Sequence, residues 1–329
     1  MSTSSLPPVT PALMPTYARQ PVAFVRGEGV WLWDTDGKRY LDTTAGIAVC
    51  GLGHANPVVA AAIADQAATL VHTSNLYRVP LQEELADLLC QVSGMTHAFF
   101  GNSGAEANEA AIKLARLHGH KKGIAVPTII VMENSFHGRT MATLTATGNA
   151  KIQEGFGPLV QGFVRVPFDD LDAIRKVAAE NPDIVAILVE PIQGESGVRT
   201  AHNGFDYLKD LRDICDQHDW LLMVDEIQTG NGRTGQYFAY QHAGILPDVV
   251  STAKGLGNGF PIGSTLVAGK AASLFSPGKH GTTYGGTPLG SRAALTTIRE
   301  LLKGPVANAA VMGERIMQGF RNELGAYGV

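Results

Sequence analysis

The chain has 329 residues, a length that suggests about two domains. It has 26 Lys and Arg against 30 Asp and Glu, and this net charge of −4 gives no reason to expect nucleic acid or a membrane surface as a partner. Its three cysteines, Cys50, Cys90 and Cys215, lie far apart, which argues against a disulfide framework or a zinc site and favours the reducing cytoplasm. Residues 1–14 lack the basic start and apolar run of a secretory signal, and no apolar run is long enough to span a membrane.

The first predicted elements are a β-hairpin and two helices. The hairpin runs from Gly29 to Leu41 with its turn at 34–37, one helix covers 58–69, and Leu81, Leu85, Leu88 and Leu89 recur at helical spacing. Short apolar runs then alternate with helical patterns. Strands are expected at 97–100, 128–132, 184–189, 221–225 and 249–250, and helices at 105–117, 171–180, 205–218, 290–302 and 306–324. This alternation predicts an α/β fold with a mainly parallel central sheet flanked by helices, whose strand order the pattern does not reveal.

Two charged residues are expected at the ends of neighbouring strands. Asp225 closes the run Leu221–Val224, and Lys254 follows the run Val249–Val250. In open α/β sheets, ligands bind outside the carboxyl ends of the strands. A lysine that forms a Schiff base, with an acid that keeps a pyridine nitrogen protonated, is the arrangement of a pyridoxal phosphate site. Taken alone, each residue is more simply interpreted as a solvated charge at a strand end.

A phosphate site is indicated by the stretch Gly101 to Glu109. It runs from a strand end into a helix, where small residues expose backbone amides and Ser103 adds a hydroxyl. A capped helix after a glycine turn is the simpler alternative. The sequence has no P-loop, no dinucleotide fingerprint and no Gly-x-Ser-x-Gly elbow, and the ten histidines show no metal-ligand spacing.

Three further motifs add candidate groups. In Phe136-His137-Gly138-Arg139, the aromatic ring can stack on a flat heterocycle and the arginine can bind a carboxylate. The stretch Glu190 to Glu195 places two carboxylates five residues apart after a predicted strand, and residues 280–286 form a loop rich in glycine and hydroxyl groups.

Together, in this order, these motifs resemble the class III aminotransferases of pyridoxal phosphate fold type I, over nearly all of residues 15–329. The resemblance implies a large cofactor-binding domain at 61–290 and a smaller α/β domain from both chain ends, 1–60 and 291–329. Members of this family have a further C-terminal segment, which supplies an arginine that pairs with a gate acid. The short C-terminus therefore gives the expectation of a truncated chain with an incomplete small domain and uncertain activity.

The resemblance also implies a role for each matching residue. Lys254 would carry the cofactor and move a proton, Asp225 would pair with the pyridine nitrogen, and Gln228 would reach the ring hydroxyl. Phe136 would stack on the ring, while Ser103, Gly104 and Ala105 would bind the phosphate. Thr283 would reach the phosphate of the neighbouring subunit, which implies a homodimer with shared sites. Arg139, with Thr282 close by, would hold a substrate carboxylate, and Glu195 resembles the gate acid.

Within the family, Ser74 to Arg78 and Thr16 to Pro21 are most similar to enzymes that move the amino group of N-acetylornithine to 2-oxoglutarate in arginine biosynthesis. Succinyldiaminopimelate, ornithine and 4-aminobutyrate remain alternative donors, because each offers a primary amine and a carboxylate. An aminomutase on the same fold and a non-catalytic cofactor-binding protein are the other open interpretations.

Overall fold

The computed structural model describes residues 10–325 of the chain. Residues 1–9 hold most of the N-terminal stretch in which no signal peptide was expected. Residues 326–329 are the last residues of the expected small domain. Those expectations lie outside the described residues. No described helix is both long enough and apolar enough to cross a membrane.

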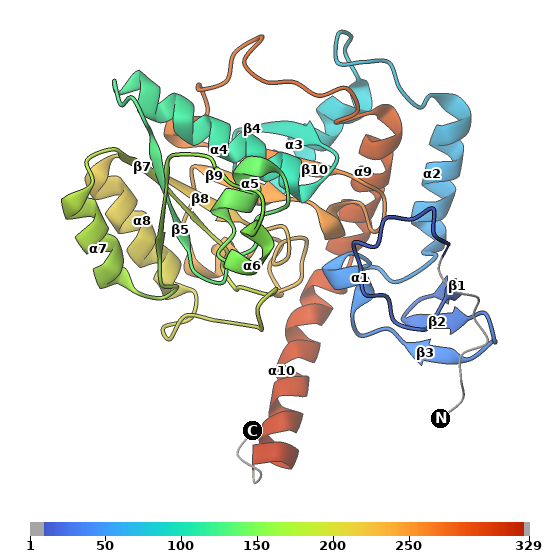
Figure 1. The fold of residues 1–329 in the computed structure, drawn as a ribbon. Coiled ribbons are helices and arrows are strands. Elements are labelled where there is room, and N and C mark those ends of the chain that lie inside the picture. The colour runs from blue at the N-terminus through green and yellow to red at the C-terminus, as the bar shows by residue number, and fades with distance from the viewer. Residues whose placement is uncertain (1–9, 326–329) are drawn as a thin grey trace.

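The N-terminal part begins with a small antiparallel sheet of β1 (Phe24–Glu28), β2 (Trp31–Asp34) and β3 (Arg39–Leu41). The pairing of β2 with β3 confirms the predicted hairpin, whereas β1 was not expected. A short turn, α1 (Ala45–Ala48), and two longer helices follow, α2 (Pro57–Thr69) and α3 (Pro80–Ser93). The small sheet lies to one side of the main body, below α2 (Figure 1).

The main body is built on a seven-stranded sheet with the order β4-β10-β9-β8-β7-β5-β6. Its strands are β4 (His97–Gly101), β5 (Thr128–Met132), β6 (Phe163–Val166), β7 (Ile184–Val189), β8 (Leu221–Asp225), β9 (Val249–Thr252) and β10 (Gly263–Val267). Strands β5, β7, β8 and β9 pair in parallel, as predicted, and β6, which was not expected, pairs in parallel with β5. Strand β10 is antiparallel to both neighbours, because the ten residues after β9 are too few for a crossover helix.

Helices cover both faces of this sheet (Figure 1). They are α4 (Gly104–Lys121), α5 (Met141–Ala146), α6 (Ala150–Gln153), α7 (Leu171–Glu180), α8 (Asp206–His218) and α9 (Pro288–Leu302). The α/β architecture predicted from the sequence is therefore confirmed. Helix α9 packs against α2 and α3, so the expected domain boundary at residue 60 falls inside a helix that contacts the main body.

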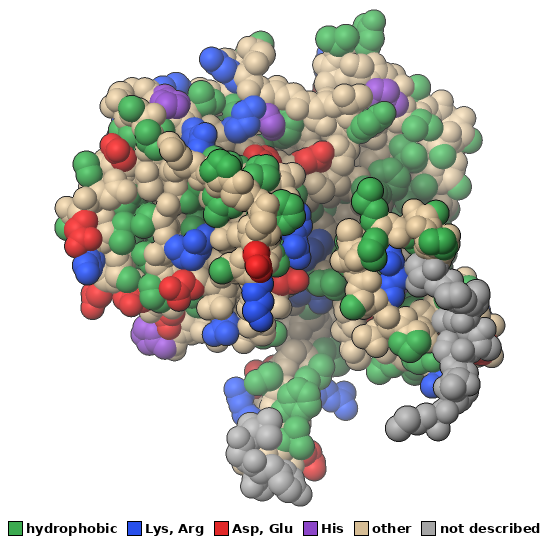
Figure 2. All heavy atoms as spheres, in the orientation of Figure 1, with side chains coloured by type: hydrophobic (Ala, Val, Ile, Leu, Met, Phe, Trp, Pro, Cys, Tyr) green, Lys and Arg blue, Asp and Glu red, His purple; other side chains and the backbone are tan. Residues whose placement is uncertain are grey.

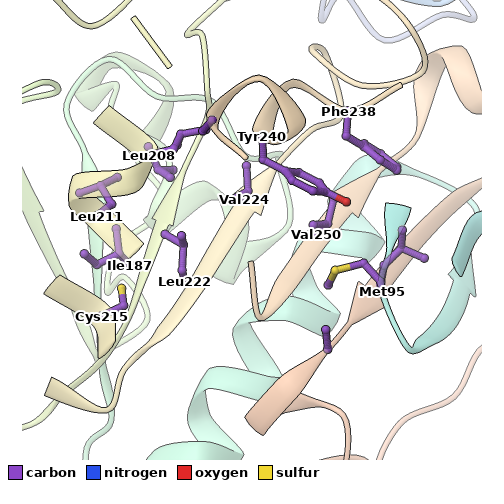
Figure 3. Packing of buried hydrophobic residues seen from close by; sticks show 14 of the residues in the cluster. Met95, Ile187, Leu208, Leu211, Cys215, Leu222, Val224, Phe238, Tyr240 and Val250 are labelled. Atoms are coloured by element: carbon purple, nitrogen blue, oxygen red, sulfur yellow. The ribbon is translucent and has the colours of Figure 1, made fainter. Parts of the chain in front are cut away.

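The core lies between the sheet and its helices. Ile187, Leu222 and Val224 point from neighbouring strands toward Leu208 and Leu211 of α8, and Phe238 and Tyr240 stack at 5.5 Å beside them (Figure 3). Burial of such a cluster supplies most of the free energy that holds the strand ends in place.

The last helix, α10 (Pro305–Leu324), projects away from the main body (Figures 1 and 2). It has no buried residue, and Val311 and Phe320 are 62% and 53% exposed. The apolar face of this predicted helix is therefore exposed to solvent in the described chain.

Candidate active site

A cavity of about 410 Å³ lies at the carboxyl ends of β8 and β9. Asp225 and Lys254 both line it, together with Phe136 and the first residues of α4. The volume is within the range of small-molecule sites. The acid and the amine that the sequence placed at two strand ends therefore face one common space.

Their proximity follows from strand pairing. Strands β8 and β9 are parallel neighbours, with Asp225 opposite Ser251, so both chains leave the sheet at the same edge. Lys254 comes three residues after Ser251 and has a left-handed backbone, with φ of 46°. This conformation is uncommon for a residue with a side chain and tends to occur at functional sites.

The N-terminus of α4 forms another wall of the cavity. Ser103 caps this helix, its Oγ accepting a hydrogen bond from the amide of Glu106 at 3.2 Å, and Gly104 and Ala105 form the first turn. A Cβ on Gly104 would lie 2.7 Å from Cδ1 of Ile227, so any larger residue here would force the Ile227 side chain to move. Amides of the first helical turn have no partner within the helix and attract anions.

Asp225 is held by three hydrogen-bond donors. Its Oδ2 accepts from Nδ2 of Asn108 at 2.7 Å and from Nδ1 of His137 at 2.8 Å, and its Oδ1 accepts from the amide of Ile227 at 3.0 Å. Asp225 is 3% exposed, and Asn108 and His137 are also buried. Burial of a carboxylate is costly without such donors, and the three bonds fix both its position and its orientation.

Phe136 and Glu190 form a further side of the cavity. Glu190 is buried and accepts a hydrogen bond from the amide of Phe136 at 3.1 Å, which joins the end of β7 to the loop after β5. Burial raises the pKa of Glu190 well above its usual range, and the negative charge of Asp225 raises it further. The guanidinium carbon of Arg139 lies 5.7 Å from the centre of the Phe136 ring.

Gln228 connects the cavity to Glu195. Gln228 lines the cavity, and its Nε2 donates to Oε2 of Glu195 at 3.5 Å. Glu195 is exposed and contacts the cavity lining through this amide. The two residues, 33 positions apart in the sequence, therefore lie side by side at the rim.

Thr282 and Thr283 lie apart from this cavity within the chain. The hydroxyl of Thr282 accepts from the amide of Gly285 at 3.1 Å, and Thr283 lines a separate narrow crevice with His72 and Asn75. The structure thus brings nine of the eleven predicted site residues to the cavity or its rim and leaves these two on a neighbouring surface.

The cavity favours the uncharged form of its amine. Burial lowers the pKa of Lys254, although Asp225, Glu195 and Glu190 act in the opposite direction. A lysine with a lowered pKa can act as a nucleophile or take up a proton near neutral pH. With an anion-binding helix end, an aromatic wall and a buried acid around it, this amine can react with a flat, phosphorylated carbonyl compound.

Asn108 and His137 are functional candidates that the sequence interpretation did not identify. Asn108 lies within the stretch Gly101–Glu109, and His137 lies within Phe136–Arg139. A sequence signal existed for Asn108, because it is a polar residue on the Ala-rich face of a helix that is otherwise buried. No local pattern distinguishes His137 from a histidine in an ordinary loop.

Comparison with known proteins gives consistent results. A family model described as Aminotransferase class-III matches residues 14–327. The acetylornithine aminotransferase of Nitrosomonas europaea is 60% identical over 96% of this chain and 80% of its own length. Acetylornithine aminotransferase 1 of Bordetella parapertussis is 52% identical over 95% of this chain and 79% of its own length.

Solved structures show the same likeness. The ornithine aminotransferase of Toxoplasma gondii ME49 superposes with a TM-score of 0.90 at 32% identity, covering 95% of this chain and 74% of that protein. Another structure of the Toxoplasma gondii enzyme reveals partial occupancy of PLP at its active site. The N-acetylornithine aminotransferase of Stenotrophomonas maltophilia K279a has a TM-score of 0.79 at 38% identity, over 94% of this chain and 77% of that protein.

Proposed function

Because this chain belongs to the class III aminotransferase family, we propose that it moves the terminal amino group of N2-acetylornithine to 2-oxoglutarate. The products are N-acetylglutamate 5-semialdehyde and glutamate, a step of arginine biosynthesis. The observation that carries this choice of donor is the 60% identity, over 96% of the chain, to an acetylornithine aminotransferase. Family membership itself makes the protein a transaminase, with an amino-acid donor and an oxo-acid acceptor.

The cofactor of this family is pyridoxal phosphate, and the residues around the cavity fit it. Bound there, it supplies an aldehyde that captures an amine and a ring that withdraws electrons from the reacting carbon. The fit rests on a helix end with open amides at Gly104 and Ala105, a half-buried amine at Lys254 and a buried acid at Asp225. Ser103 would add a hydroxyl for the phosphate, Phe136 would cover the ring, and Gln228 would reach its hydroxyl group.

Lys254 is proposed as the catalytic base. Burial lowers the pKa of its amine, which favours the form that can take a proton from the carbon bearing the donor's amino group and return it at the next step. Asp225, held by Asn108 and His137, provides a fixed negative charge that stabilises a protonated ring nitrogen.

Substrate carboxylates would be bound by Arg139. Its guanidinium is exposed at the cavity beside Phe136, so it can form a two-pronged contact with a carboxylate. Glu195 is proposed as the gate acid, and its contact with Gln228 places it at the cavity rim.

We propose that the enzyme is a homodimer in which Thr283 of a second copy reaches the phosphate and Thr282 of that copy approaches Arg139. The exposed apolar side chains near this loop support such a face: Leu76, Tyr77 and Tyr284 are 87%, 71% and 65% exposed. We also propose a domain division at 1–60, 61–290 and 291–329, and a cytoplasmic location, which the three free cysteines favour.

A panel of donors tests this function. Purified protein with pyridoxal phosphate is given N2-acetylornithine, succinyldiaminopimelate, ornithine or 4-aminobutyrate with 2-oxoglutarate, and glutamate formation is followed. We expect the highest kcat/KM with N2-acetylornithine, and no glutamate from the Lys254→Ala variant. A better rate with another donor refutes the specificity, and turnover without an oxo acid indicates an aminomutase.

A further inference from the structure

We propose that Asn258 is a positioning residue that fastens residues 45–54 to the loop carrying Lys254, and thereby holds the Val49 wall of the cavity in place for the amine donor. This inference deepens the proposed function and depends on it for the identity of the donor. Val49 is the one N-terminal residue, among those described from residue 10 onward, that lines the cavity, so its position relative to the lysine loop affects the shape of the site on that side.

The side chain of Asn258 binds the two backbone groups that flank the Leu52–Gly53 peptide bond. Its Oδ1 accepts a hydrogen bond from the amide of Leu52 at 2.9 Å, and its Nδ2 donates to the carbonyl oxygen of Gly53 at 3.2 Å. Within residues 10–325, these are the hydrogen bonds between segment 45–54 and loop 253–262. Asn258 comes four residues after Lys254, and the next residues, Gly259 and Phe260, line the cavity.

The segment that Asn258 holds is unusual in conformation. Ala45, Gly46, Ile47 and Ala48 all have left-handed backbones, with φ of 50°, 69°, 63° and 64°. Consecutive left-handed residues with side chains are unfavourable, so this turn needs restraints from outside. Strain of this kind next to a cavity wall points to a functional requirement for that backbone path.

The restraints lie at both ends of the turn. On its N-terminal side, Oδ1 of Asp42 accepts from the amides of Thr44 and Ala45, and Oδ2 of Asp42 bonds Nε2 of His54 at 2.7 Å. Those contacts stay within the N-terminal part. Asn258 supplies hydrogen bonds between this segment and the main body, and it does so from the loop that presents the reactive amine.

Loss of this link should weaken donor binding more than the proton transfer. Lys254 and Asp225 are positioned by strands β8 and β9, which do not depend on segment 45–54. Release of Val49 would remove an apolar contact from the bound donor and admit water to the cavity. Two lost hydrogen bonds correspond to a rise of about five- to twenty-fold in the KM for the donor, with kcat changed by less than about two-fold.

Two variants separate the effect of the two Asn258 hydrogen bonds, called the clamp below, from the effect of backbone strain. Asn258→Gly removes both side-chain hydrogen bonds and keeps a residue that tolerates φ of 47°, whereas Asn258→Ala removes them and adds strain. Both should raise the KM equally, and only the alanine variant should lose additional stability. The matched control is Asn56→Ala, which removes the cap of α2, where Oδ1 accepts from the amides of Val58 and Val59.

The second measurement is hydrogen exchange of the peptide covering 45–54, with and without pyridoxal phosphate. We expect about ten-fold faster exchange there in Asn258→Gly and wild-type exchange in Asn56→Ala, whose KM also stays unchanged. An unchanged KM, unchanged exchange, or a fall in kcat at constant KM in Asn258→Gly would overturn the proposal. A wild-type protein without transaminase activity would refute the proposed function, and the exchange measurement would then decide the clamp by itself.

Discussion

Replacement of Asn108 by alanine tests whether the buried donors around Asp225 serve the cofactor or only the fold. The change removes one bond to the Asp225 carboxylate, 2.7 Å long, and one to the carbonyl of His137, 2.9 Å long. A hydrogen bond to a charged group contributes about 1.5–3 kcal/mol and a neutral one about 0.5–1.5 kcal/mol. Alanine recovers about 0.5 kcal/mol through its helix propensity. We therefore expect the free energy of unfolding to fall by about 1.5–4 kcal/mol.

The affinity for pyridoxal phosphate should fall as well. Asp225 would keep two donors, Nδ1 of His137 and the amide of Ile227, and its carboxylate could turn away from the cavity. We expect the Kd for pyridoxal phosphate to rise about 10- to 100-fold, which corresponds to about 1.4–2.8 kcal/mol. Urea unfolding gives the stability, and titration of the cofactor-free protein by absorbance gives the Kd.

Thr297→Val is the control for these measurements. Thr297 is fully buried in α9, and its Oγ1 donates to the carbonyl of Ala293 at 2.9 Å. This variant should lose stability but bind the cofactor like the wild type. If Asn108→Ala is destabilised yet binds pyridoxal phosphate within about two-fold of the wild type, Asn108 does not position Asp225 and the reasoning is refuted.

Three other variants probe the same region. Burial raises the pKa of Glu226 to about 7, so the folded protein loses stability as pH rises from about 4.5 to 7 and the unfolded chain ionises first. Thermal unfolding at pH 5 and pH 8 should therefore show a loss of free energy of unfolding in the wild type that exceeds the loss in Glu226→Gln by about 2–3 kcal/mol. An equal loss in both proteins would contradict this assignment. Gly104→Ala places a Cβ 2.7 Å from Ile227 and should weaken cofactor binding about ten-fold in the same titration, since overpacking costs about 1–3 kcal/mol. Arg139→Lys keeps the charge but loses the two-pronged contact, so steady-state kinetics should show the KM of both substrates rising about ten-fold or more; an unchanged KM would remove Arg139 from the substrate site.

Local sequence determined most of the secondary structure and the chemical core of the site. The helix at 171–180 and the strand at 184–189 occur at the predicted residues, because the helical period and the continuous apolar run are each encoded within ten residues. Asp225 and Lys254 could be predicted for a similar reason. A polar residue directly after a buried parallel strand must emerge at the edge of the sheet where ligands bind.

Tertiary structure alone decided the remainder. Strand β10 has a weak apolar pattern and exists because β4 and β9 offer it hydrogen bonds on both sides. Asn108 bonds groups that lie 29 and 117 residues away, and Asn258 bonds the amide of Leu52, 206 residues away. A hydrogen bond depends on positions in space that the packing of the whole core sets, so no pattern within a short stretch of sequence could have revealed these partners.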